Sequence, residues 1–161
     1  MGLDMQTVTG RSEYAAVARA LVSGARRQLD LLSYNLDRNA YGSADFVEAV
    51  KLLLLSSQAA RLRVLVNQPR LAMLKGHALI ELGRQISSRV EFRELPPERL
   101  DDNRGELLIV DQRDVLEQRE HGGLEARLWR DAADLARKRG EFFDLLWAES
   151  LPSHELRQLH L

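Results

Sequence analysis

The sequence predicts an α/β fold, a three-layer α-β-α sandwich built around a mixed, mostly parallel sheet. Two short apolar runs that contain β-branched residues, at 61–67 and 105–111, are typical of buried strands. The segments between such runs repeat apolar residues at three- and four-residue spacing, as amphipathic helices do. Because strands and helices alternate along the chain, we expect parallel strands with helices on both faces of the sheet.

The first half of the chain begins with a polar lead-in, residues 1–10. Ser12 can cap a helix that starts at Glu13 and carries an apolar face to about residue 25. A strand is predicted at 29–34, followed by a polar loop at 35–39. Ser43 can cap the next helix, which we expect at 44–57.

The second half opens with the strand at 61–67. Pro69 suits the first turn of a helix, which is predicted to run to Ile86. A half-exposed strand at 89–95 ends at two prolines, and a charged loop follows at 98–104. The runs 105–111 and 115–120 then predict a hairpin. After a break at 121–123 we expect one long helix, 125–150, in which Gly140 can introduce a kink. The predicted domain is therefore 11–150, with a polar tail at 151–161.

Composition limits the classes of function. The chain has 161 residues, 45% of them hydrophobic and 29% charged, which is ordinary for a soluble globular domain. A net charge of −1 argues against a uniformly basic nucleic-acid surface, although a local basic patch is compatible with it. The absence of cysteine excludes disulfides and thiolate metal sites. The first residues lack a signal-peptide pattern and the leucine run at 51–56 is far too short to cross a membrane, so a cytoplasmic protein without membrane contact is expected.

One short pattern at the predicted hairpin carries a resemblance. Arg104, Glu106 and Asp111 have the spacing Arg-x-Glu-x4-Asp. This spacing resembles the His-x-Lys-x4-Asp motif of the phospholipase D superfamily. Of the three motif residues, only the aspartate is present in this chain, as Asp111. The Gly-Ser positions that follow in the family read Gln118 and Arg119 here. The chain resembles one half of a phospholipase D fold over about residues 10–150.

A narrower resemblance is to an uncharacterised bacterial phospholipase-D-like domain that occurs alone or beside N-acetyltransferase domains. It rests on segments 33–37, 64–67, 76–82 and 107–111, and on the ending 143–150, which is similar to the Phe-Asp-x-x-Trp pattern of the family's last helix. By this resemblance we expect a homodimer, because single-repeat members pair across the site face. An N-acetyltransferase neighbour is a further expectation of the same kind.

The resemblance implies that the family's chemistry is lost. That chemistry needs a histidine nucleophile, a lysine that neutralises phosphate oxygens and a second histidine that protonates the leaving group. Arg104 has no free lone pair for attack, and Glu106 brings negative charge to the phosphate position. We therefore expect no catalytic residue, no cofactor and a role in binding or assembly.

The candidate ligand-binding residues are polar groups that follow predicted strands, where α/β proteins place ligands. An ion pair of Arg104 with Glu106 or with Asp37 is the simplest interpretation, and a pocket for a small charged molecule is the alternative. The candidates are Asn35, Asp37, Arg38, Asn67, His77, Arg104, Glu106 and Asp111.

Two other functions stay open. One is nucleic-acid binding inherited from nucleases of the superfamily. The other is residual hydrolysis by His77, predicted inside a helix. No metal is expected, because His121, His154 and His160 form no ligand cluster. The basic patch proposed for nucleic acid comprises Arg61, Arg63, Arg89, Arg93, Arg99 and Arg104.

Overall fold

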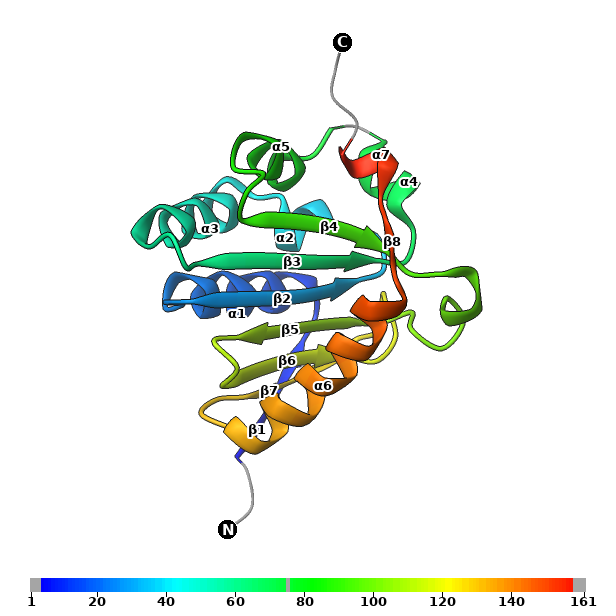
Figure 1. The fold of residues 1–161 in the computed structure, drawn as a ribbon. Helices are drawn as coiled ribbons and strands as arrows, with labels where there is room; N and C mark the ends of the chain where they lie inside the picture. The colour runs from blue at the N-terminus through cyan, green and yellow to red at the C-terminus, as the bar shows by residue number, and fades with distance from the viewer. Residues whose placement is uncertain (1–3, 75, 158–161) are drawn as a thin grey trace.

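A computed structural model describes residues 4–74 and 76–157 and shows one eight-stranded sheet between two layers of helices (Figure 1). The strand order is β1-β7-β6-β5-β2-β3-β4-β8. The strands are β1 (Met5–Thr9), β2 (Gln28–Ser33), β3 (Arg61–Val66), β4 (Val90–Glu94), β5 (Glu106–Val110), β6 (Asp114–Gln118), β7 (Glu125–Trp129) and β8 (Leu151–Pro152). The helices are α1 (Arg11–Ser23), α2 (Arg38–Tyr41), α3 (Ala44–Ser56), α4 (Pro69–Met73), α5 (Ala78–Gln85), the 3-10 turn η1 (Pro97–Arg99), α6 (Ala133–Glu149) and α7 (His154–Arg157).

The predicted α/β class and the mixed sheet are confirmed, but the balance of strand directions differs from the prediction. Strands β2, β3 and β4 pair in parallel. The other ladders between described strands are antiparallel. The sheet is therefore not mostly parallel. One reason is that the predicted hairpin β5–β6 continues into β7, and hairpin-linked strands must run antiparallel. Strand β1, from the start of the chain, then pairs antiparallel with β7.

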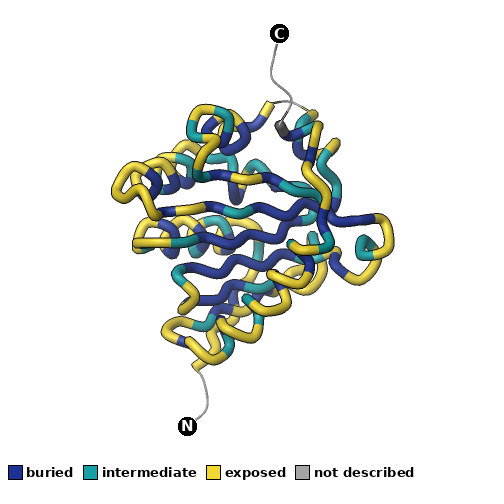
Figure 2. Tube along the Cα trace, viewed as in Figure 1, coloured by how far each residue is buried: buried dark blue, intermediate teal, exposed yellow. Residues whose placement is uncertain are grey.

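Two hydrophobic cores lie on the two faces of the sheet. Strand β5 is buried along its whole length, so its side chains alternate between the cores (Figure 2). Leu108 and Val110 pack with α1, α3 and α5, whereas Leu107 and Ile109 pack against α6. This alternation fixes the register of β5, since a slip by one residue would exchange the faces.

The N-terminal prediction is corrected in two ways. The polar lead-in contains β1, which pairs with β7 from Met5 opposite Trp129 to Thr9 opposite Glu125; residues 1–3 lie outside the described part of the chain. Helix α1 starts at Arg11, so Ser12 is not its cap. Gly10 holds the N-cap position at a φ of 86°, which glycine adopts without strain.

Three further segments differ from the prediction. The helix predicted from Pro69 to Ile86 is two helices, α4 and α5, with His77 at the start of the second. The start of the predicted long helix is instead strand β7, and α6 then runs uninterrupted through Gly140. The tail contains β8 and α7, and buried Ser153 and Leu156 anchor it. Residues 125–129 form a strand because they pair with β6, and the spacing of apolar residues along the sequence does not reveal this pairing.

The helices within the described ranges include no segment long and apolar enough to cross a membrane.

Candidate functional site

The site is built around Glu106, the first residue of β5. Its side chain is buried, with 4% of the residue exposed. Oε1 accepts a hydrogen bond from the Tyr41 hydroxyl at 2.9 Å. Oε2 accepts one from the backbone N–H of Tyr34 at 2.8 Å and lies 3.4 Å from Nδ1 of His121. All these neighbours present hydrogens, which matches a carboxylate that can only accept.

Two tyrosines extend this network away from the carboxylate. The hydroxyls of Tyr14 and Tyr41 are 2.5 Å apart, and the rings meet edge to face. Burial raises the pKa of both phenols well above its ordinary value, so both keep their protons. Because Tyr41 uses its proton on Glu106, Tyr14 must donate to the Tyr41 oxygen. The direction of the hydrogen-bond chain is thereby fixed.

His121 closes the other side of the carboxylate. Its hydrogen bond to Glu106 raises the pKa of the imidazole. The imidazole stacks on the ring of Tyr34, with centroids 4.8 Å apart. The Arg104 guanidinium also lies over that ring, 5.2 Å from its centre. The backbone N–H of His121 donates to the backbone carbonyl of Arg104 at 2.9 Å, so this hydrogen bond connects the loop after β6 to the start of β5.

A cavity of about 290 Å³ opens beside these groups. Arg11 and Asp37 form an ion pair of 3.0 Å there, and Oδ1 of Asn35 is buried without a hydrogen-bond partner among the described residues. The lining residues are Arg11, Tyr14, Asn35, Asp37, Ala40, Tyr41, Glu106, Gln118, His121, Gly122 and Gly123. The cavity therefore combines aromatic walls, two carboxylates and two basic groups.

Three of the predicted site residues, Asn35, Asp37 and Glu106, meet at this cavity. Two others hold loops together. Arg38 donates to the carbonyls of Gly76 and Ala72. The Asn67 amide donates to the carbonyls of Leu100 and Asn103. Both side chains are used for architecture.

His77 was predicted inside a helix, but the structure places it at the N-cap position of α5. Its Nδ1 accepts from the N–H of Leu79 at 3.2 Å, and its Nε2 lies 2.8 Å from the carbonyl of Leu36. This pair of partners requires the neutral tautomer with the proton on Nε2. Burial lowers the pKa of the imidazole, which favours the same neutral form. Neither ring nitrogen is left to act on a substrate.

Asp111 lies at the end of β5 opposite to Glu106. Its carboxylate accepts from the backbone N–H groups of Arg26, Arg27 and Gln28 at 2.8–2.9 Å. It therefore holds the start of β2 and contributes nothing to the cavity.

The predicted ion pairs of Arg104 are wrong. Asp37 pairs with Arg11, and Glu106 pairs with His121, while Arg104 is exposed. The prediction assumed that residues 104 and 106 share one face of a strand. Strand β5 begins only at Glu106, and Gly105 packs so closely on the carbonyl of Gln118 that an added Cβ would lie 2.3 Å from it. The backbone before β5 is therefore not a regular strand.

Among the cavity residues absent from the predicted site are four with polar side chains that form its hydrogen bonds and ion pairs: Arg11, Tyr14, Tyr41 and His121. The sequence predicts an apolar helix face in the segment that contains Tyr14 and a chain break at His121. Tyr41 is 65 positions from Glu106. No local spacing signals a contact of that range.

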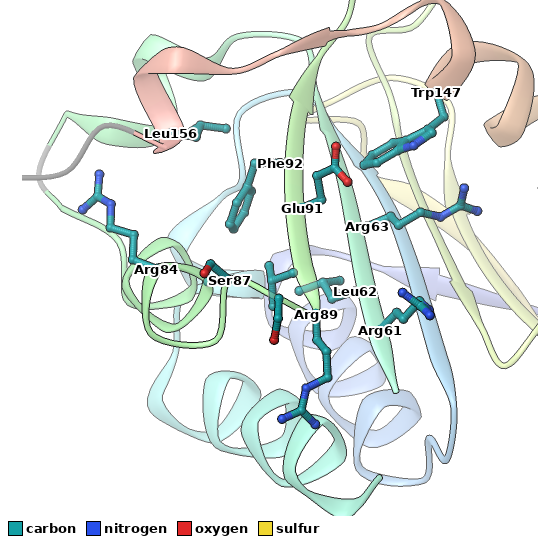
Figure 3. A pocket seen from close by; sticks show the side chains of 13 residues that line it. Arg61, Leu62, Arg63, Arg84, Ser87, Arg89, Glu91, Phe92, Trp147 and Leu156 are labelled. Carbon is teal, nitrogen blue, oxygen red and sulfur yellow. The ribbon is translucent and has the colours of Figure 1, made fainter. Parts of the chain in front are cut away.

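A second, larger cavity of about 540 Å³ surrounds the outer part of β4. Figure 3 shows Arg61, Arg63 and Trp147 on one side of this strand and Phe92 and Leu156 on the other. Three arginines of the predicted basic patch, at 61, 63 and 89, line it.

Most of the predicted basic patch has partners within the protein. Arg63 binds Asp30 and Asp144, each at 2.8 Å. Arg89 donates to the carbonyls of Leu54 and Ser57. Arg93 pairs with Glu91 and Arg99 with Glu149, each at 2.7 Å. Arg104 lies over the ring of Tyr34 and lines neither cavity.

Within the described ranges, no group of three or more His, Asp or Glu side chains is arranged to hold a metal ion.

Comparison with solved structures finds the same fold in other proteins. Nuc from Salmonella typhimurium, described as a phospholipase D family member, superposes with a TM-score of 0.64 at 13% identity, over 94% of this chain and 99% of that one. NucT from Helicobacter pylori gives 0.66 at 12% identity, over 94% and 100%. TrmBL2, an archaeal chromatin protein that binds DNA, gives 0.64 at 16% identity over 92% of this chain; the chain spans 54% of TrmBL2.

Sequence comparison adds the family. A search of curated proteins found no match. Residues 10–159 match the family described as Domain of unknown function (DUF7931). The chain therefore belongs to the DUF7931 family and has a phospholipase-D-like fold.

Proposed function

We propose that this protein is a non-catalytic phospholipase-D-like domain that binds a ligand or partner without cleaving it. The observation that carries the proposal is Glu106. Where the resembling motif has a lysine, this chain has a buried carboxylate saturated by the Tyr34 N–H, the Tyr41 hydroxyl and His121. A phosphate placed there would meet a like charge in a poorly solvated site, which disfavours its binding.

The nucleophile position supports the same conclusion. Arg104 is exposed, lies over Tyr34 and carries a guanidinium that cannot attack phosphorus. His77 has both ring nitrogens bonded. His121 is the imidazole nearest to the former site, but its Nδ1 serves Glu106.

Hydrolysis of bis-p-nitrophenyl phosphate tests the proposal. Wild type, His121→Ala and His77→Ala should all give the buffer background. A rate clearly above background that His121→Ala or His77→Ala abolishes would refute the non-catalytic role and identify the histidine responsible.

A homodimer is the form of assembly that we propose for it. Support comes from the single-repeat members that the chain resembles and from the match to 99% of the Nuc chain, so that this protein corresponds to one whole Nuc chain. Two-fold pairing is also the commonest oligomeric arrangement. Cytoplasmic location and a neighbouring N-acetyltransferase domain are proposals from the same resemblance.

Light scattering after size exclusion measures the mass directly. We expect twice the 18.3 kDa of the chain at micromolar concentration. If the pairing face is the site face, Arg104→Glu should shift the protein toward monomer while the exposed Arg127→Glu, on β7, should not. A monomeric wild type would contradict the assembly proposal.

Nucleic-acid binding is the second candidate function, and one observation favours it. The side chains of Arg61, Arg63 and Arg89 line a single cavity around β4 (Figure 3). Arg61 is exposed and has no ion pair within the described ranges. The DNA-binding TrmBL2 has the same fold.

Fluorescence anisotropy with short single- and double-stranded DNA tests this candidate at about 50 mM salt, where phosphate contacts are strong. Binding that Arg61→Gln weakens and Arg127→Gln does not would support it. No binding at this salt concentration would end it.

A further inference from the structure

We infer that the cavity beside Glu106 selects small molecules carrying an ammonium or guanidinium group. The inference rests on the proposed non-catalytic function and names the ligand class for the same site. It inverts the charge preference expected of a phosphodiester site.

The first argument is the direction of the hydrogen-bond chain. Tyr41 donates to Glu106 at 2.9 Å, and its oxygen lies 2.5 Å from that of Tyr14. Each phenol has one proton, so the proton of Tyr14 is used on Tyr41. What Tyr14 can still offer to the cavity is lone pairs. The buried network therefore ends in an acceptor.

The second argument is the unpartnered amide oxygen. Oδ1 of Asn35 is buried and accepts no hydrogen bond from the described residues, and the side chain lines the same cavity. A buried acceptor without a partner costs free energy. Because this oxygen is itself inaccessible to solvent, a donor-bearing ligand recovers that free energy when the Asn35 side chain turns the oxygen toward the cavity. Asp37 adds a carboxylate at the same cavity. The available acceptors thus come from two separate segments of the protein, α1 and the loop after β2.

The third argument is charge. The two basic groups of the cavity are each paired with a carboxylate, Arg11 with Asp37 at 3.0 Å and His121 with Glu106 at 3.4 Å. No uncompensated positive charge is therefore available to hold an anion. Two tyrosines, Tyr14 and Tyr41, form part of the wall and bring the acceptor end of the hydrogen-bond chain to it. A volume of about 290 Å³ limits the ligand to a small molecule.

Ligand-detected and protein-detected NMR titrations test the inference with defined probes. The cations are methylammonium, guanidinium and 1,4-diaminobutane, and the anions are acetate and inorganic phosphate, all at constant ionic strength. We expect saturable shifts of residues lining the cavity with at least one cation, and none with the anions.

Variants locate the binding. Asn35→Ala removes the unpartnered acceptor and should weaken cation binding about tenfold, the usual effect of one hydrogen bond from a charged donor. Asn39→Ala, an exposed asparagine of the adjacent helix α2, is the matched control and should bind as wild type. Tyr14→Phe provides a second test should Asn35→Ala fold poorly, and it should also weaken binding.

Binding of phosphate in the cavity, or no saturable binding of any cation, would overturn the inference. So would cation binding that neither Asn35→Ala nor Tyr14→Phe changes. Failure of the proposed function would appear differently, as phosphodiester hydrolysis. A protein that neither hydrolyses phosphodiesters nor binds the cations would retain the proposed function and lose this inference.

Discussion

Replacing Glu106 by lysine should destabilise the protein more than any conservative change at that position. The substitution restores the residue type of the family motif, but it does so in an environment built for a carboxylate. The Tyr34 N–H, the Tyr41 hydroxyl and His121 all direct hydrogens at this side chain. An ammonium has three hydrogens and no acceptor, so its contacts with the Tyr34 N–H and with His121 become conflicts.

The magnitude follows from burial. Glu106 is 4% exposed, so the introduced charge has little access to water. Removing one partner of a buried charge pair costs about 3–5 kcal/mol, and the lysine additionally faces His121. With a urea m-value of about 2 kcal/mol/M, the midpoint of unfolding should fall by roughly 2 M. Glu106→Gln should cost only about 1–2 kcal/mol. Its amide can donate to Tyr41, which can then turn its own proton toward Tyr14.

Urea unfolding followed by tryptophan fluorescence measures both variants against wild type. The order wild type, Gln, Lys in decreasing stability is the expected result. A lysine variant within about 1 kcal/mol of wild type would show that the hydrogen-bond network around position 106 does not require a carboxylate, and the proposed non-catalytic function would lose the observation that carries it.

Three further perturbations test other parts of the structure by the same assay. Asp111→Ala leaves three backbone N–H groups at the start of β2 without their acceptor and should cost about 2–4 kcal/mol, with Asp111→Asn intermediate. Arg63→Met leaves buried Asp30 without its ion-pair partner and should lower the free energy of unfolding by about 3 kcal/mol. Asp144→Asn, at the exposed end of the same network, should lower it by under about 1 kcal/mol. The pKa of His121 is raised in the folded protein. The contribution of its protonated imidazole to the free energy of unfolding is therefore complete below about pH 6.5 and is lost as the pH rises through the raised pKa. The stability difference between wild type and His121→Gln should accordingly shrink at alkaline pH.

The central strands were predictable because their signal is local. Apolar, β-branched runs at 61–66 and 106–110 cannot be placed anywhere except inside the sheet, and the structure has β3 and β5 there. The edge elements were not predictable in the same way. Strand β1 is polar and largely exposed, and it forms only because β7 offers it an edge. Strand β8 is two residues long and depends on β4.

The cavity residues likewise include some that the sequence predicts and others that it does not. Asn35, Asp37 and Glu106 were found because residues that follow or begin strands at one end of a sheet converge there. Tyr14, Tyr41 and His121 were missed because their polar atoms act through contacts between distant segments, while their positions in the sequence suggest only packing or a chain break.

The one motif residue that this chain shares with the superfamily pattern is also the one whose role here is architectural. Leu32 of β2 is opposite Leu107 of β5 and Leu29 is opposite Val110, so the two ends of β5 lie at opposite ends of β2. Glu106 meets the cavity at one end, and Asp111 holds the start of β2 at the other. Changing the residue type at 106 should therefore alter what the cavity can bind. Changing residue 111 removes support from a central strand. Positions 106 and 111 therefore have separate roles, because the first faces the cavity and the second supports the sheet.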